Sequence, residues 1–431
     1  MRADREISVD YLARVEGEGA MYLRLRGNEV TDLKFEIFEP PRFFEAFLRG
    51  RHFSEAPDLT SRICGICPIA YQVSAVNAME HAGRASVDET LLDLRRLVYC
   101  GEWIASHCLH VYLLHAPDFL GYSGVAELAR HFPEEVRRGL DLKKTGNRIM
   151  AVLGGREIHP VNVRVGGFHK TPSRRDLDAL VPELEQALTT AQETVRWVSG
   201  FPFPDFQRDY EFVALRHPDR YAIESGTVVS NRGLEVPVEE WPEHFEERQV
   251  SWSNALHSRL KQRGAYHVGP MARYNLNFEQ LTPLARRAAE DAGLGASCTN
   301  PFRSIVVRSI EMVLAAEEAL RIVGSYRLPA AGNVAVDPRS STGHGASEAP
   351  RGLLYHRYDI DAEGLITEAH IVPPTAQNQL SIEDDLRALV PGHAHLPDDA
   401  LRWQLEQAIR NYDPCISCAT HFLDLTVERE T

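Results

Sequence analysis

The amino-acid sequence predicts an α+β fold that is mainly helical, with a bundle of long helices at its core and small antiparallel sheets at its periphery. Two observations lead to this prediction. Several long stretches repeat their apolar residues close to every 3.6 positions, the period of an α-helix. Segments with strand-like alternation lie toward both ends of the chain, outside the main run of helices. This order favours a helical bundle flanked by sheets over a parallel α/β fold.

The first predicted elements are a β-hairpin and a short helix. Apolar residues alternate with polar ones over residues 21–25 and again over 33–37, and a turn is expected at Gly27-Asn28 between them. A proline then opens a helix over residues 42–49, since proline suits the first helical turn.

Long helical patterns follow. The longest runs from about residue 88 to residue 116, where the apolar stripe keeps a period close to 3.6. Another helix begins at Pro68, directly after Cys67. Further helices are expected over residues 133–152, 174–199, 301–323 and 399–411.

The remaining segments divide into strands and loops. Strands are expected within residues 211–238 and 352–372, the second as a hairpin that turns near Gly364. Residues 200–205 and 328–350 are rich in proline, glycine or serine and are the best candidates for loops.

Composition excludes several classes of protein. Of the 431 residues, 44% are hydrophobic and 25% are charged, which excludes a disordered chain. The formal net charge of -14 argues against nucleic-acid binding, because phosphates repel an acidic surface. No apolar run reaches the ~18–20 residues that span a bilayer. The N-terminal residues lack the apolar core of an export signal, so we expect a cytoplasmic protein.

Four of the seven cysteines form two pairs with the same spacing. Cys64 and Cys67 lie near the start of the chain, and Cys415 and Cys418 lie near its end. A CxxC turn directs two sulfurs at one point, so together the pairs could form a site with four thiolate ligands. A structural zinc, a metal centre buried in a large core and a redox dithiol all remain open from spacing alone. Isolated cysteines are commonly small buried hydrophobic residues, and we interpret the other three in this way: Cys100, Cys108 and Cys298.

The flanking residues make the pairs more specific. The runs RICGIC at 62–67 and DPCISCATH at 413–421 together resemble the paired signature of the large subunit of nickel–iron hydrogenases. Further segments resemble other motifs of that family, in the same order along the chain: RVEG at 14–17, PRFFE at 41–45, HCLHVYLLHAPD at 107–118, VGP at 268–270 and EAPRG at 348–352.

This resemblance implies a nickel ion and an iron ion that share two cysteine sulfurs, with carbon monoxide and cyanide as further ligands of the iron. Cys64 and Cys415 would be terminal nickel ligands, and Cys67 and Cys418 would bridge nickel to iron. Soft thiolates suit both metals. The implied reaction is the reversible heterolytic cleavage of dihydrogen, with the Cys415 thiolate as the first proton acceptor.

The resemblance also gives three neighbouring residues a role. Glu16 would relay the proton outward, although a glutamate at a hairpin edge is commonly just solvated. Arg351 would lie over the open face of the metals, although it could instead form an ordinary salt bridge. Thr375 would donate a hydrogen bond to a cyanide ligand.

Other predicted residues lie farther from the reaction. Glu45 and His421 would bind a structural magnesium ion, a hard cation that prefers carboxylate oxygen, although His421 could be an ordinary tail residue. Asp413 and Asp118 would orient Arg351 or the histidine-bearing helix. His107 shares a helix face with a second histidine, and we interpret it as a packing residue rather than a metal ligand.

The sequence departs from the common family pattern at two positions. Tyr71 stands where many members carry histidine, and Ser106 stands where aspartate is common. The run VPPTAQ at 372–377 and the modest length resemble the cytosolic, bidirectional, NAD(P)-linked branch of the family.

Electron transfer requires partners. No iron–sulfur spacing and no glycine-rich nucleotide motif appear beyond the two cysteine pairs. An iron–sulfur small subunit is therefore implied, together with flavin and iron–sulfur diaphorase subunits. By resemblance, residues 1–421 form one domain, and a maturation endopeptidase removes residues 422–431. Three alternatives are a hydrogen-sensing relative, a non-catalytic relative of respiratory quinone reductases and a structural zinc scaffold.

Overall fold

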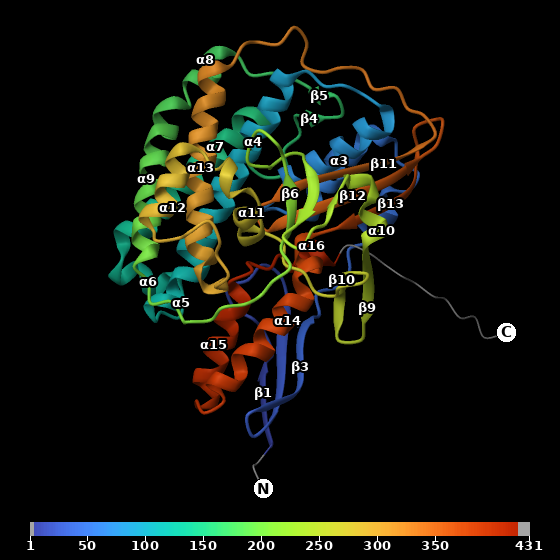
Figure 1. The fold of residues 1–431 in the computed structure, drawn as a ribbon. Coiled ribbons are helices and arrows are strands. Elements are labelled where there is room, and N and C mark those ends of the chain that lie inside the picture. Colours follow the sequence, from blue (N-terminus) through green and yellow to red (C-terminus); the bar gives the residue numbers. More distant parts are fainter. Residues whose placement is uncertain (1–3, 421–431) are drawn as a thin grey trace, which may run out of the picture.

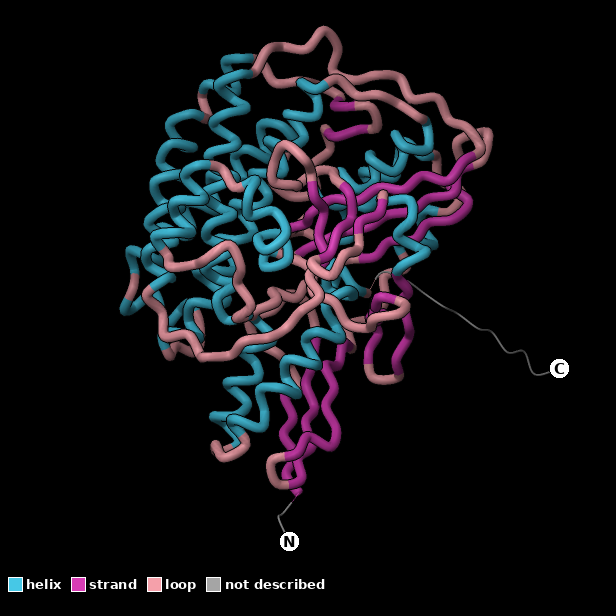
Figure 2. Tube along the Cα trace, in the orientation of Figure 1, coloured by secondary structure: helices cyan, strands magenta, loops and turns pink. Residues whose placement is uncertain are grey.

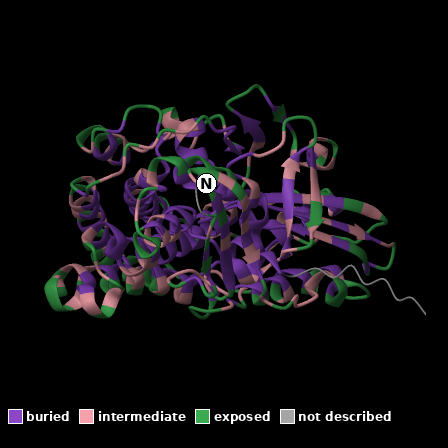
Figure 3. Cartoon of the chain, turned by 90° about the horizontal axis from the view of Figure 1, so that it is seen from below, coloured by how far each residue is buried: buried purple, intermediate pink, exposed green. Residues whose placement is uncertain are grey.

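The computed structural model describes residues 4–420. Helices gather on one side of the molecule and the longer strands on the other (Figures 1 and 2). The sheets are small and, in the strand pairs of residues 4–420, antiparallel, so the predicted mainly helical α+β class is confirmed. Buried residues fill the space between the helices and the sheets (Figure 3). Across residues 4–420, no helix combines the length and the apolar composition needed to cross a membrane.

The chain begins with a three-stranded sheet. The predicted hairpin is confirmed, because β2 (Gly19–Arg26) and β3 (Glu29–Ile37) pair on either side of the turn at Gly27-Asn28. The sequence analysis missed β1 (Asp4–Val9), which pairs with β2 and buries only Ile7 and Val9. Two apolar positions in a charged hexapeptide are too weak a signal for a strand.

Four long helices form the bundle: α4 (Glu89–Cys108), α7 (Pro133–Gly154), α9 (Val181–Ser199) and α13 (Ser304–Ser325). Glycines let α4 and α7 approach closely, since a Cβ added at Gly146 would lie 2.5 Å from the carbonyl oxygen of Gly101. The longest predicted helix does not stay regular. After Cys108 it widens into a π-helical turn over Leu109–His115, and α5 (Ala116–Leu120) follows.

The remaining α-helices connect the layers: α1 (Phe44–Leu48), α2 (Ala56–Thr60), α3 (Pro68–Gly83), α6 (Val125–His131), α8 (Arg174–Asp178), α10 (Trp241–His244), α11 (Pro270–Asn277), α12 (Pro283–Asp291), α14 (Pro374–His393), α15 (Asp398–Arg410) and α16 (Ile416–Ala419). The helix predicted over 174–199 is in fact two, because α8 ends before α9 begins at Val181. The sequence analysis missed α14. Its first half buries Gln377, Asn378 and Gln379 beside apolar residues, so the amphipathic contrast is weak there.

Two further sheets have three strands each. One consists of β11 (Ser341–Ala349), β12 (Gly352–Ile360) and β13 (Ile366–Val372), and the other of β6 (Val213–Arg216), β7 (Thr227–Ser230) and β8 (Glu235–Val236). Two-stranded sheets are formed by β9 (Phe245–Val250) with β10 (Ser253–Leu260), and by β4 (Val163–Arg164) with β5 (Gly167–Phe168). The hairpin predicted over 352–372 is confirmed as β12 and β13. The loop predicted over 328–350 is wrong from Ser341 onward. Glycines suggested a loop there, but they let β11 lie against α3: a Cβ added at Gly343 would lie 2.1 Å from Ala78 O.

Candidate metal centre

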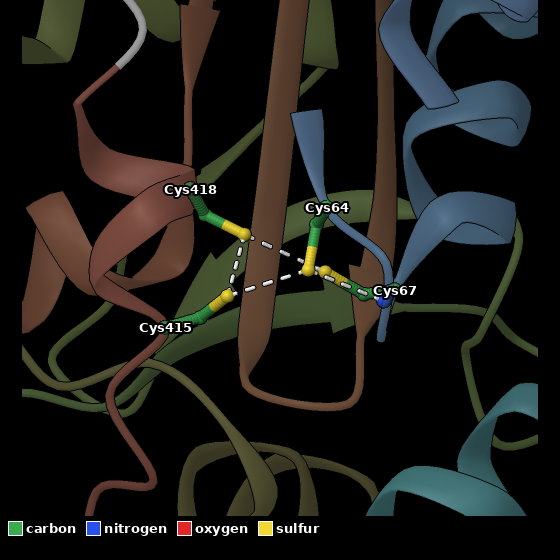
Figure 4. Close-up of side chains that lie close together, drawn as sticks. All are labelled: Cys64, Cys67, Cys415 and Cys418. Carbon is green, nitrogen blue, oxygen red and sulfur yellow. Dashed lines mark hydrogen bonds between the residues drawn. The ribbon is translucent and has the colours of Figure 1, made fainter. Parts of the chain in front are cut away.

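The two cysteine pairs meet in the interior, although they come from opposite ends of the chain (Figure 4). The sulfurs of Cys64 and Cys415 lie 3.4 Å apart, and those of Cys67 and Cys418 lie 3.6 Å apart. All four sulfurs lie within 4.8 Å of one another. A single metal site, or two metals that share sulfurs, can therefore be held by the four thiols.

Each pair is positioned by the start of a helix. Cys67 directly precedes α3, and Cys415 directly precedes α16. The backbone N–H groups of Ile66 and Cys67 donate to the sulfur of Cys64 at 3.3 and 3.4 Å. Backbone N–H groups in this arrangement favour negatively charged sulfur. Hydrogen bonds from the other cysteines, first Cys415, and the charge of Arg351 lower the pKa of Cys64 well below its ordinary value.

Glu16 is brought to the centre by a backbone contact between the two ends of the chain. It forms a parallel bridge with Cys415, and Ile416 N donates to Glu16 O at 2.9 Å. The carboxylate oxygen Oε2 of Glu16 accepts from Cys415 Sγ at 3.1 Å and from Ser417 N at 3.1 Å. Burial, and then the charge of Cys64, raise the pKa of Glu16 above its ordinary value. Glu16 is therefore not a solvated hairpin-edge residue.

Gly17 makes this approach sterically accessible. Its φ is 89°, and a Cβ would lie 2.6 Å from the Ile416 side chain. A larger residue would push the segment that carries Glu16 away from the cysteines.

Arg351 is buried beside the cysteines and is held by one aspartate. Its Nε donates to Asp413 O at 2.7 Å, and its Nη2 donates to Asp413 Oδ1 at 3.1 Å. Asp413 adopts a left-handed backbone conformation with φ of 53°, which aspartate tolerates better than most residues. Among the described residues, Arg351 Nη1 has no hydrogen-bond partner. This leaves one donor of the guanidinium group available to a ligand.

Thr375 also lies at the centre, but it contacts the protein backbone. Its hydroxyl oxygen accepts from Cys415 N at 2.9 Å, at the start of α14. It therefore helps to orient the segment that carries the C-terminal pair.

Asp118 lies elsewhere in the network. Its carboxylate accepts from Arg410 Nε at 2.7 Å and from Arg410 Nη2 at 2.8 Å, and it also binds Arg14. We expected Asp118 to orient either Arg351 or the histidine-bearing helix. Asp118 lies in α5, directly after that helix, and its ion pairs join this end of the helix to the segments that carry Glu16 and Asp413.

His107 is buried in α4, with its Nε2 2.9 Å from Glu311 Oε2. Burial lowers its pKa to about 4, so the imidazole is neutral at pH 7. Within residues 4–420, the four cysteines and the more exposed set of Glu240, Glu243 and His244 are the only groups with metal-binding geometry, and neither includes His107. This arrangement fits a packing role.

Glu45 lies in α1 and accepts from Ile371 N at 2.7 Å through Oε1. Its predicted partner His421 lies outside the described residues. The described chain ends nearby, because Arg42 N, three residues before Glu45, donates to Thr420 O at 2.8 Å.

Sequence analysis did not identify Glu102, which is fully buried in α4. Its carboxylate accepts from Ile69 N at 2.6 Å and from Ala70 N at 3.1 Å, so it binds the first turn of α3, next to Cys67. Burial raises its pKa well above the ordinary value. The available signal was a glutamate within an otherwise apolar stretch of helix. Tyr71, one turn after Cys67, is buried too, and burial followed by the nearby charges of Cys418 and Cys67 raises the pKa of its hydroxyl well above the ordinary value.

Comparison with known proteins identifies the family. A family model described as nickel-dependent hydrogenase matches residues 42–134 and 238–421. Sulfhydrogenase 1 subunit alpha of Pyrococcus furiosus is 32% identical over 423 residues, which cover 97% of this chain and 98% of that protein. The NAD-reducing hydrogenase HoxS subunit beta of Cupriavidus necator is 28% identical, covering 97% of this chain and 95% of that protein.

A solved structure agrees with these relatives. An NAD+-reducing [NiFe]-hydrogenase in the H2-reduced state has a TM-score of 0.88 and 28% identity, covering 97% of this chain and 99% of that chain. The chain therefore belongs to the nickel-dependent hydrogenase family, in which it is the large, catalytic subunit of a nickel–iron hydrogenase.

Proposed function

We propose that the four cysteines bind nickel and iron as the resemblance implies, with Cys64 and Cys415 terminal on nickel and Cys67 and Cys418 bridging to iron. The meeting of four buried sulfurs with Glu16 and Arg351 supports this assignment most directly. Zinc would also accept four thiolates, but it would not use a carboxylate that contacts a ligand sulfur. When bound, the metals, with carbon monoxide and cyanide on the iron, make dihydrogen acidic enough to split heterolytically.

The proton route begins at Cys415 and continues to Glu16. The sulfur and the carboxylate oxygen are 3.1 Å apart, within reach for direct proton transfer. A raised pKa brings the Glu16 carboxylate closer to the ambient pH, which suits a group that must both accept and release a proton. Ser417 N fixes the orientation of the carboxylate.

Arg351 and Thr375 position the reacting groups. Nη1 of Arg351 provides a donor for a small molecule or for a cyanide ligand on the open face. The Thr375 hydroxyl accepts from Cys415 N, and its own proton remains available to a cyanide.

Magnesium binding and C-terminal processing are two further parts of the proposal. Glu45, with His421, would bind a structural magnesium ion, and a carboxylate oxygen suits this hard cation. An endopeptidase would remove residues 422–431 after His421 once the metals are inserted. Residues 1–421 would then be the mature single domain.

Electrons leave through other subunits. The described chain has one cluster of four cysteines, which the nickel–iron pair would occupy, so iron–sulfur clusters would come from a small subunit. The relatives named as NAD-reducing support NAD(P) as the final acceptor, through flavin and iron–sulfur diaphorase subunits. A reaction linked to the nicotinamide pool would take place in the cytoplasm.

The experiment is an infrared spectrum of the complex purified from its native host, with nickel, iron and zinc measured in the same sample. We expect bands from metal-bound carbon monoxide and cyanide, nickel and iron near one each per chain, and dihydrogen-dependent reduction of NAD or NADP. Zinc alone, with no such bands in a processed chain, would overturn the assignment. In the Cys418→Ser variant both metals should be lost, whereas Cys298→Ser, which changes a buried cysteine outside the cluster, should keep them.

A further inference from the structure

Around Asp413, the residue that holds Arg351, the structure has a second buried polar region. Arg308, in the second turn of α13, is 1% exposed. Its Nη1 lies 3.6 Å from Asp413 Oδ2, beyond direct hydrogen-bond distance, and its Nη2 donates to Asn411 O at 3.4 Å. The other carboxylate oxygen of Asp413 accepts from Arg351. Asp413 therefore lies between two guanidinium groups, with a hydrogen bond to Arg351 and a longer ion pair to Arg308.

Two histidines from the π-helical turn lie close enough to Arg308 to feel its charge. The rings of His110 and His115 lie 4.8 Å apart, and both side chains are buried. His110 Nε2 donates to Arg410 O at 2.7 Å, which leaves Nδ1 as an acceptor in the neutral ring. Burial, and then nearby positive charges that include Arg308, lower the pKa of both histidines well below the ordinary value. Both rings are therefore neutral at pH 7.

Several buried polar atoms in this region have no hydrogen-bond partner among the described residues. The buried atoms without a hydrogen-bond partner among residues 4–420 are Nε and Nη1 of Arg308, Nδ2 and Oδ1 of Asn411, Oδ2 of Asp413, Nδ1 of His110, and Nδ1 and Nε2 of His115. Buried polar atoms of this kind are costly unless a partner binds them.

The mixture of donors and acceptors identifies the ligand. Arg308 and the Asn411 amide offer N–H donors, whereas Asp413 Oδ2, Asn411 Oδ1 and His110 Nδ1 are acceptors. A cation would use only the acceptors, and an anion would use only the donors. Water does both, and a buried water typically makes about three hydrogen bonds to such groups. A separation of 3.6 Å between Arg308 and Asp413 is also one that a bridging water commonly spans.

We propose that Arg308, Asn411, His110 and His115 bind a group of ordered waters, and that through these waters Arg308 positions Asp413 and thereby Arg351. Arg308 is a positioning residue, because it reaches the metal centre only through Asp413. The functional consequence rests on the role proposed above for Arg351. The water site itself rests only on the geometry.

The first test is an experimental structure of the assembled wild-type enzyme at a resolution that shows ordered water. We expect water within hydrogen-bond distance of both Arg308 Nη1 and Asp413 Oδ2, with further water at His115. Direct pairing of these side chains with no water between them would overturn the proposal, as would density for an ion.

The second test uses Arg308→Met, with Arg308→Lys for rescue and Arg321→Met as the control. Arg321 is on the same helix, but its side chain is 50% exposed. Arg308→Met should move the Arg351 guanidinium group in the structure, shift the cyanide bands, and slow dihydrogen oxidation by about tenfold to a hundredfold at unchanged nickel and iron content. Lysine should recover part of this loss, and Arg321→Met should show none.

Unchanged Arg351 geometry and unchanged bands in Arg308→Met would overturn the positioning role. If that variant does not fold, the wild-type structure still decides whether water is bound. If the wild-type enzyme has no hydrogenase activity, the proposed function fails, but the water and the position of Arg351 can still be read from the structures.

Discussion

Glu16→Gln is the substitution that separates proton transfer from metal binding most cleanly. In the wild-type protein, Glu16 Oε2 accepts a hydrogen bond from Ser417 N at 3.1 Å. Glutamine has the same shape, so its side-chain oxygen can still accept this bond. It cannot accept a proton from Cys415 Sγ, which also lies 3.1 Å from that oxygen. The variant should therefore keep its fold and its metals and lose its proton acceptor.

The size of the effect follows from this geometry. Removing a positioned general base typically slows a reaction by about 10²–10⁴-fold. This corresponds to about 2.7–5.4 kcal/mol of activation free energy. The upper half of this range is expected, because Glu16 is the one carboxylate of the described residues that hydrogen-bonds to a cysteine of the centre.

The pH dependence gives an independent check. Burial raises the pKa of Glu16, so its proton-accepting form is lost at a higher pH than for an exposed glutamate. Wild-type dihydrogen oxidation should therefore fall as the pH drops through this raised value, and the Gln variant should lack this decrease.

The assay is exchange of deuterium gas with water, measured beside metal content and the infrared bands. Glu18→Gln is the matched control, because Glu18 is two residues away and its side chain is exposed. Full exchange in Glu16→Gln, with metals in place, would refute the relay. Equal losses in both variants would point to a general effect of charge instead.

Three further predictions concern stability and processing. Asp118→Asn should destabilise the subunit by about 3–5 kcal/mol, measured as a lower melting temperature, because it leaves the charge of buried Arg410 without its closest partner. Gly146→Ala should destabilise by about 1–3 kcal/mol, since its Cβ would lie 2.5 Å from Gly101 O and force α4 and α7 apart. The mass of the active subunit should lack residues 422–431, and the full-length chain should persist in nickel-starved cells.

The two stability predictions each have a control variant. Asp398→Asn removes an exposed partner of Arg5 and should change the melting temperature little. Gly324→Ala adds a methyl group with no atom within 4 Å, so it should be neutral or stabilise by up to about 1 kcal/mol. Equal effects within either pair would contradict the packing argument, and an active enzyme of full length would contradict processing.

The strongest local patterns predicted their elements well. The hairpin around Gly27-Asn28 and the long amphipathic helices follow from short-range periodicity, which can be read from a short window of the sequence. Elements that bury polar residues or glycines were missed, because their sequences show little contrast between a polar and an apolar face. Helix α14 buries its amides as well as its apolar residues, and β11 carries glycines that usually indicate loops.

For the candidate site too, the sequence predicted some features and not others. The sequence by itself determined the ligand chemistry, since two CxxC turns each direct a pair of thiols at one point, and it indicated Glu16, Arg351 and Asp413 through their motifs. It did not determine which of these groups touch. Asp118 binds Arg410 and Arg14, and Thr375 binds the backbone of Cys415.

Only the tertiary structure decided these contacts, because the packing that brings distant segments together does not follow from local sequence patterns. Residues such as Glu16 and Cys415 are brought together by the burial of apolar faces, which is non-directional and allows many arrangements of the same elements. Hydrogen bonds of about 3 Å then select one of them. Spacing along the chain therefore determines what chemistry a segment can perform, whereas the packing of distant segments determines which partner receives the proton or the charge.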